Sequence, residues 1–176
     1  MKLIQNLHPE DPALNKMYIE RGDQEKVLWR DFLFLRNIES GGELFIPEGI
    51  EEIEEGALHY CGRHHTIHFP KTLRKLSPNL FAESFSSRRM RPLTIIYPGS
   101  SERFMELAAP VKEDQYVTDG FDRSPYYSGG SRRITECHTF DEWVGEIRVE
   151  CEEDGVTLLY GSDHRKNGEP PKRLEV

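Results

Sequence analysis

Three stretches of the chain repeat one pattern of apolar and polar positions. In each stretch, apolar residues stand three positions and one position before a proline, and further apolar residues follow it at fixed offsets. The prolines are Pro47, Pro70 and Pro98, which lie 23 (70 − 47) and 28 (98 − 70) residues apart. A repeat of about 20–29 residues is typical of a solenoid, in which each turn stacks on the next.

Each repeat begins with a short predicted strand that its proline ends. Side chains alternate between the two faces of a strand, so the apolar residues before each proline are expected to point inward. These inward residues are Leu44, Ile46, Ile67, Phe69, Ile95 and Tyr97. Six positions after the prolines stand Ile53, Leu76 and Phe104. Because the same offsets are apolar each time, successive turns can stack like residue on like residue.

The positions that alternate with the inward residues, four and two before each proline, form a predicted outward face. They are Glu43, Phe45, Thr66, His68, Thr94 and Ile96. Phe45 and Ile96 are apolar where the pattern calls for solvent, and contiguous apolar surface usually marks an interface. The sequence therefore predicts a binding surface for a protein or peptide, with a second copy of the chain among the candidate partners. The alternative is that the chain covers this face itself, with its N-terminal segment or with a C-terminal hairpin.

Charged residues at matching offsets support the stacking of neighbouring turns. The sign of the charge reverses between the first and second repeats at each of three offsets, which pair Glu48 with Lys71, Glu51 with Arg74, and Glu52 with Lys75. Exposed ion pairs contribute roughly 0–1 kcal/mol each. Their expected effect is therefore on register more than on stability.

Residues 1–42 are predicted to form a helical or irregular cap at the N-terminus. Asp11-Pro12 favours a short helix that would reach Met17. A hairpin with strands 17–21 and 26–30 is the alternative. The apolar spacing of Trp29, Phe32 and Phe34 also matches the beginning of a repeat and predicts a degenerate first turn there.

The C-terminal region, residues 134–176, is predicted to contain a β-hairpin over Trp143–Tyr160. Two apolar runs there flank the turn residues Glu152–Gly155. Ser128–Ser131 is a predicted linker before this region, and Gly161–Val176 is a predicted tail.

The motif F-I-P-E-G-I-E-E-I-E-E-G-A-L, followed by Tyr60-Cys61, resembles the BspA-type leucine-rich repeats of bacterial surface proteins. The resemblance covers about residues 43–117. His64 stands where that family usually has leucine, and the second repeat carries five extra residues (28 − 23). The resemblance implies a short right-handed solenoid. The expected fold class is thus α+β and β-dominated, with an irregular N-terminal cap and a C-terminal hairpin region.

The amino-acid composition limits which partners and which cellular location are expected. The formal net charge is −8, which argues against nucleic acid, because its binders usually cluster Lys and Arg. Three widely spaced cysteines make no disulfide framework. The sequence shows neither a signal peptide nor an apolar run of membrane-spanning length. A cytoplasmic location is expected, or the cell surface if the chain is a processed fragment.

Candidate chemistry in the sequence is sparse. His59, Cys61, His64, His65 and His68 are residue types that bind zinc. Their spacing, however, places Cys61 and His64 inward and the others elsewhere, so we expect no metal site and no cofactor. Cys137 and His138 are adjacent, a poor geometry for a nucleophile and its base. We therefore predict a non-enzymatic binding module, with a small-molecule enzyme or metal-binding protein using the histidine cluster as the alternative.

Overall fold

The structure, a computed structural model, describes residues 1–28, 31, 39, 41–54, 56–59, 61–77, 80–81, 90–108, 115–117, 132–134, 140, 143–166 and 169–175. Within that part of the chain, the protein is dominated by β-strands and has one α-helix, α2 (Ser101–Leu107). This agrees with the predicted α+β, β-dominated class. The predicted linker Ser128–Ser131 and the Cys137–His138 pair lie outside the described residues.

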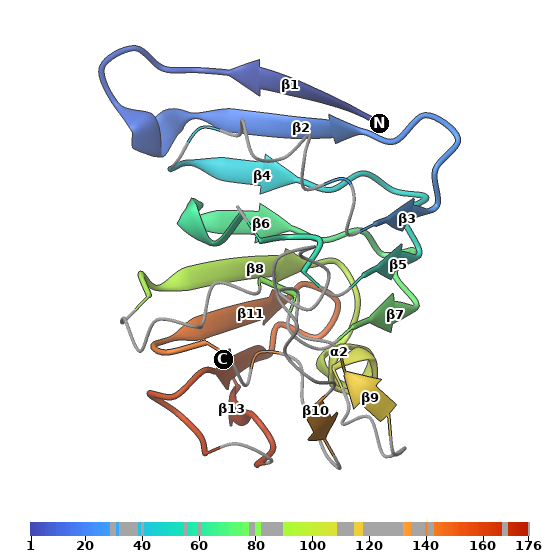
Figure 1. Ribbon diagram of the computed structural model, residues 1–176. Coiled ribbons are helices and arrows are strands. Elements are labelled where there is room, and N and C mark those ends of the chain that lie inside the picture. Colours follow the sequence, from blue (N-terminus) through green and yellow to red (C-terminus); the bar gives the residue numbers. More distant parts are fainter. Residues whose placement is uncertain are drawn as a thin grey trace.

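A mixed eight-stranded sheet runs along the molecule (Figure 1). Its strands, in spatial order, are β1 (Lys2–Asn6), β2 (Lys16–Glu20), β4 (Glu43–Phe45), β6 (Thr66–His68), β8 (Leu93–Tyr97), β11 (Ile147–Cys151), β12 (Thr157–Tyr160) and β13 (Lys172–Leu174). Neighbours from β2 to β11 are parallel. Antiparallel pairs complete the two ends of the sheet, β1 with β2 at one end and β11–β12–β13 at the other.

The predicted register of the repeats is confirmed in the parallel centre of this sheet. Leu44 lies opposite Ile67, and Ile67 lies opposite Ile95. All three side chains are fully buried, whereas the residues beside them in each strand are partly exposed. A shift by one residue would turn this apolar column toward solvent, so burial of the column specifies the register.

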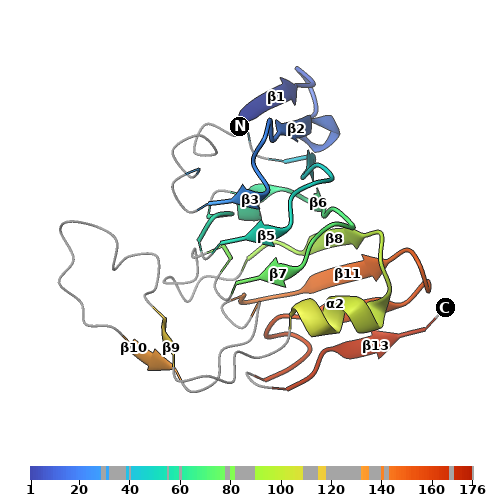
Figure 2. The same cartoon turned by 90° about the vertical axis from the view of Figure 1, so that its right-hand side faces the viewer.

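A second, three-stranded sheet stands beside the first, on the right of Figure 1. Its strands are β3 (Lys26–Val27), β5 (Glu52–Ile53) and β7 (Lys75–Leu76). Ile53 lies opposite both Val27 and Leu76, as its offset from the proline predicts for Leu76. In Figures 1 and 2, α2 lies lower than β7 and to one side of it. Phe104 of this helix is fully buried, so the third member of the predicted column also faces the core.

Two of the three predicted ion pairs between turns are present. Glu52 accepts from the Nζ atoms of both Lys26 (2.8 Å) and Lys75 (3.2 Å), which joins all three strands of the second sheet. The hydrogen bond from Lys26 is the main cause that lowers the pKa of the Glu52 carboxyl. Arg74 and Glu51 form the other pair at 3.7 Å.

The third predicted ion pair, between Glu48 and Lys71, is wrong. The Glu48 carboxylate instead accepts from the backbone N–H groups of Lys71 (2.8 Å) and Thr72 (3.2 Å). Glu48 follows its strand at the corner of the turn, where the next turn presents free backbone donors. The Lys71 Nζ pairs with Glu153 at 3.1 Å.

The prediction of a helical or irregular N-terminal cap is wrong for much of its described part, because β1 and β2 form two strands of the main sheet. Asp11 does cap a short 3-10 turn, Pro12–Leu14, but Met17 belongs to β2. Only Met17 and Ile19 of β2 are buried. Two alternating apolar residues are too weak a local signal to distinguish a strand.

The predicted hairpin of residues 17–21 and 26–30 is also wrong, since β2 and β3 lie in different sheets. The strand beside β4 is β2, with Met17 opposite Leu44. The strand that precedes the first proline repeat in the sheet is therefore β2, whereas Trp29, Phe32 and Phe34, the predicted beginning of a degenerate first turn, lie outside the described residues. No proline marks β2, and that explains why the repeat pattern missed it.

The predicted C-terminal hairpin is confirmed as β11 and β12, which are antiparallel with Ile147 opposite Tyr160. Its turn is fastened to α2, because Asp154 Oδ2 accepts from the backbone N–H (2.9 Å) and the hydroxyl (2.7 Å) of Ser101. Part of the predicted tail forms β13, whose three residues are exposed and give no apolar alternation to detect. A separate pair, β9 (Gln115–Val117) with β10 (Arg132–Ile134), completes the described strands.

Candidate functional site

The six residues predicted to bind a partner lie together on one face of the main sheet. They form two columns across β4, β6 and β8, one of Glu43, Thr66 and Thr94 and the other of Phe45, His68 and Ile96. Each of the six is partly exposed, and the residues between them are buried. We call these six residues the strand face.

A column of stacked rings crosses the strand face. The ring of Phe45 lies between those of Tyr18 and His68, at centroid distances of 4.7 Å and 4.1 Å and interplanar angles of 13° and 9°. The backbone register produces this stack, since Tyr18 lies opposite Phe45 and Phe45 opposite His68. Ring pairs of this kind contribute about 0.5–1.5 kcal/mol beyond the area that they bury. We call Tyr18, Phe45 and His68 the ring column.

Stacking decides what the ring column can offer a ligand. The near-parallel rings turn their flat surfaces toward one another, so Phe45 has no free flat surface on which a sugar or base could stack. The column presents ring edges to solvent, together with the aliphatic side chain of Ile96 beside His68. Ring edges and aliphatic carbons suit contact with apolar side chains of another polypeptide.

Glu43 orients the last ring of the column. Its Oε2 lies 2.6 Å from Nε2 of His68, and both side chains are about one-third exposed (35% and 29%). Carboxylate and imidazole thus join the polar column to the ring column. The bond fixes one edge of the imidazole while its flat surface stacks on Phe45.

Sequence reasoning missed Tyr18 as a member of this surface. The signal was the alternation of Met17, Tyr18 and Ile19, which reads as a strand once β2 is aligned with β4. It also missed Arg148 and Glu150 of β11, which continue the two columns beyond Thr94 and Ile96.

β1, β2 and the C-terminal hairpin lie in the sheet beside the strand face, and of these only β2 touches Phe45, through the ring of Tyr18. The hairpin joins the sheet edge-on, with β11 paired to β8, and β2 joins at the opposite side of β4. The alternative in which the C-terminal hairpin covers Phe45 and Ile96 is therefore wrong. The hairpin buries its apolar residues on the inner face of the same sheet, because Val149 continues the column of Ile95.

The histidine cluster is divided between the interior and the surface. Cys61 and His64 are buried as predicted, His65 is exposed, and His68 belongs to the strand face. No group of three or more potential metal ligands occurs among the described residues. The residues that suggested zinc are thus not brought together.

His64 is a buried residue of the core. Its Nδ1 lies 3.0 Å from the carbonyl oxygen of Gly41, whereas its buried Nε2 has no hydrogen-bond partner among the described residues. Burial lowers the pKa of the imidazole below its ordinary value of 6.5. A proton added at Nε2 would find no acceptor, which agrees with that direction.

We expect His64 to make the protein less stable in mild acid. A lowered pKa in the folded state means that the unfolded chain binds more protons, so stability is complete above pH 6.5 and falls as the pH drops below it. The free energy of unfolding measured by urea denaturation between pH 7.5 and pH 5 should fall more for the wild type than for His64→Leu. Equal losses in the two proteins would contradict this account.

An open pocket of about 390 Å³ lies at the corner that follows β6 and β8. Lys71, Arg74 and Arg103 line it and suggest an anion site. Each of the three cations already has a carboxylate partner, in the pairs Lys71–Glu153, Arg74–Glu51 and Arg103–Glu106. The pocket therefore offers little uncompensated positive charge to an anion.

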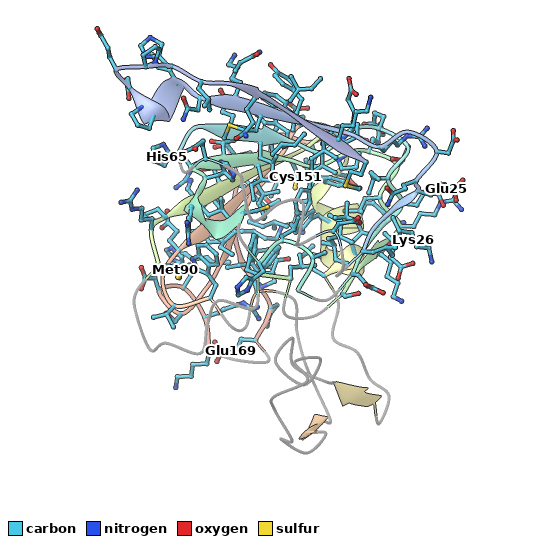
Figure 3. All side chains as sticks on the ribbon, turned by 45° about the horizontal axis from the view of Figure 1, so that its top comes forward. Glu25, Lys26, His65, Met90, Cys151 and Glu169 are labelled. Carbon is cyan, nitrogen blue, oxygen red and sulfur yellow. The ribbon has the colours of Figure 1, made fainter. Side chains whose placement is uncertain are left out.

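Reactive thiols are not found among the described cysteines. Cys61 and Cys151 are buried and are not joined in a disulfide, and Figure 3 shows Cys151 among the side chains of the interior. Burial raises the pKa of the Cys151 thiol to about 12, which keeps it protonated and inert near neutral pH.

Two further findings bear on the class of protein. In the described parts of the chain, no helix has the length and apolar character needed to cross a membrane. Comparisons with protein-family models, with curated proteins and with solved structures found no match to this chain.

Proposed function

We propose that this chain is a short right-handed solenoid of the leucine-rich-repeat type and that it works as a non-enzymatic module for binding a protein or peptide. The strand face is the proposed binding surface. The solenoid is supported by the way equivalent residues of successive repeats lie opposite one another in both sheets, with Leu44 opposite Ile67 in one and Ile53 opposite Leu76 in the other.

The ring column is the observation that carries the proposed activity. Aromatic side chains usually bury their surface, yet Tyr18, Phe45 and His68 stand partly exposed on the outer face of the sheet, in a row with Ile96. Stacking already restricts the rotamers of these rings, so a partner would lose little side-chain entropy in ordering them. Preorganised aromatic residues of this kind often supply the central contacts of an interface.

The class of partner follows from the chemistry of the surface. The net charge of −8 disfavours binding to a phosphate backbone. The strand face presents ring edges, aliphatic carbons and an acid–imidazole pair, which are suited to contact with a polypeptide. A carbohydrate would need a free flat ring surface, which the stack does not leave on Phe45.

We expect Phe45→Asp and Ile96→Asp to weaken binding at least tenfold, about 1.4 kcal/mol. Each change puts a charge into the apolar part of the strand face. Peptides selected from a displayed random library on the immobilised protein would supply the ligand, and calorimetric titration would give the dissociation constant for each variant.

Thr157→Asp is the matched control, because Thr157 lies on the same outward face of β12, two strands beyond Ile96. It should bind the selected peptides as the wild type does. The proposal fails if the library yields no binder, or if the selected peptides bind all three variants with the wild-type affinity.

A further inference from the structure

The main sheet ends in two edge strands of different character. β1 is the last strand at one end and β13 is the last at the other, so among the described residues each has one side without a strand partner. An unpaired edge exposes backbone donors and acceptors that can pair with another chain. Natural edges are usually protected by charges or proline.

Exposed apolar residues gather at the β1 edge. Four large apolar side chains are well exposed in the described part of the protein: Ile4, Leu7, Leu14 and Leu174. Three of them belong to β1 or to the loop that joins it to β2. Ile4 is 43% exposed and stands at the end of the ring column, opposite Tyr18.

β1 is also complementary to a second copy of itself. In an antiparallel pairing of two β1 strands centred on Ile4, that residue lies opposite its own symmetry mate, Leu3 lies opposite Gln5, and Lys2 lies opposite Asn6. All five residues are paired, and no like charges face each other. The pairing relates the two copies by a two-fold axis that passes through Ile4.

β13 lacks this complementarity. The same operation on Lys172–Leu174 places Arg173 opposite Arg173 of the second copy, which like-charge repulsion disfavours. Pro170 and Pro171 come directly before the strand and have no N–H to donate to a further ladder. Of the two edges, β13 is therefore the protected one.

Charge favours the same end of the molecule. Two chains of net charge −8 repel each other overall. The β1–β2 pair, however, carries Lys2 and Lys16 against Glu20, a local balance of +1 (2 − 1), so contact there brings little negative charge together.

From these observations we propose that two copies of this chain associate through antiparallel pairing of their β1 strands. The eight-stranded sheets then form one continuous sheet, and the two ring columns meet at Ile4 on the two-fold axis. This association goes beyond the proposed binding of a partner and does not depend on it. A contact of five residues per strand falls below the area of a standard stable interface, so we expect a reversible dimer that forms at high concentration.

Sedimentation velocity from roughly 10 µM to roughly 1 mM tests the proposal directly. The wild type should shift with concentration from the 20.5 kDa monomer toward a species of twice that mass. Ile4→Lys should remain monomeric, because two ammonium groups would then face each other at the axis. Leu174→Lys, a matched change at an exposed residue of the other edge, should dimerise as the wild type does.

A cross-linking experiment tests the same contact by a positive signal, so that a variant that merely fails to fold cannot be mistaken for support. Directly opposed residues in an antiparallel pair have Cα atoms about 4.5–5.5 Å apart, within the range of a disulfide. In a Cys137→Ser background, Ile4→Cys should form a covalent dimer under mild oxidation and Leu174→Cys should not. The proposal is overturned by a monomeric wild type over the whole range, by equal cross-linking of both variants, or by growth beyond the dimer, which would indicate β1–β13 pairing.

Discussion

Replacing Phe104 with alanine is expected to lower the free energy of unfolding by about 3–5 kcal/mol. Phe104 is fully buried and is the centre of an aromatic cluster. Its ring centroid lies within 6.4 Å of those of Phe69, Tyr97, Phe140 and Tyr160. These four rings come from two repeats, from the segment before the hairpin and from the hairpin itself. The substitution would leave a cavity lined by several separate elements. The expected loss is large because all of these elements would have to move together to fill it.

Urea denaturation followed by circular dichroism measures this loss. Glu106→Ala is the control on the same helix, since Glu106 is exposed and pairs with Arg103 on the surface. Its effect should stay within about 0.5 kcal/mol. A loss below about 1 kcal/mol for Phe104→Ala would mean that α2 is not part of the cooperative core.

The second large effect is expected from Gly42→Ala, at about 2–5 kcal/mol of lost stability. Gly42 has φ +74°, and an added Cβ would overlap the backbone carbonyl of Asn15. That carbonyl accepts from Glu43 N–H at 2.8 Å, and the Gly42 carbonyl accepts from His65 N–H at 3.0 Å. The substitution would therefore push β2 away from β4 at the point where the parallel strands begin.

Gly22→Ala provides the matched comparison for Gly42. Gly22 also has a positive φ, +59°, but an added Cβ would meet no atom within 4 Å. It should lose only the conformational penalty of about 1–2 kcal/mol. Thermal or urea unfolding of the two variants separates backbone strain from steric overlap, and equal losses would show that the contact with Asn15 is unimportant.

The sequence alone predicted the structure wherever the same spacing of apolar residues was repeated along the chain. The column of Leu44, Ile67 and Ile95, the pairing of Ile53 with Leu76 and the two strands of the C-terminal hairpin were all predicted from apolar spacing, and the structure confirms them. The six residues of the strand face follow from the same alternation. Burial of apolar side chains is favoured in most surroundings, so a regular spacing of them along the chain reveals which face of an element turns inward.

Other parts of the molecule depend on contacts between segments that are far apart in the chain. β1 and β13 gain their strand structure from a neighbouring strand and carry little apolar alternation of their own. Glu48 satisfies backbone donors of the next turn and forms no side-chain pair with Lys71, a choice that residue types alone do not reveal.

The candidate site also combines features that the sequence predicts with features that only the tertiary structure determines. Alternation along each strand placed Phe45 and His68 on the outer face, and it did so from a few neighbouring residues. The stack with Tyr18, the bond between His68 and Glu43, and the exposed end at Ile4 were decided by which strands lie side by side. Periodicity specifies the direction of a side chain relative to its own strand, whereas its partners depend on strand order, which is set by the packing of the whole chain.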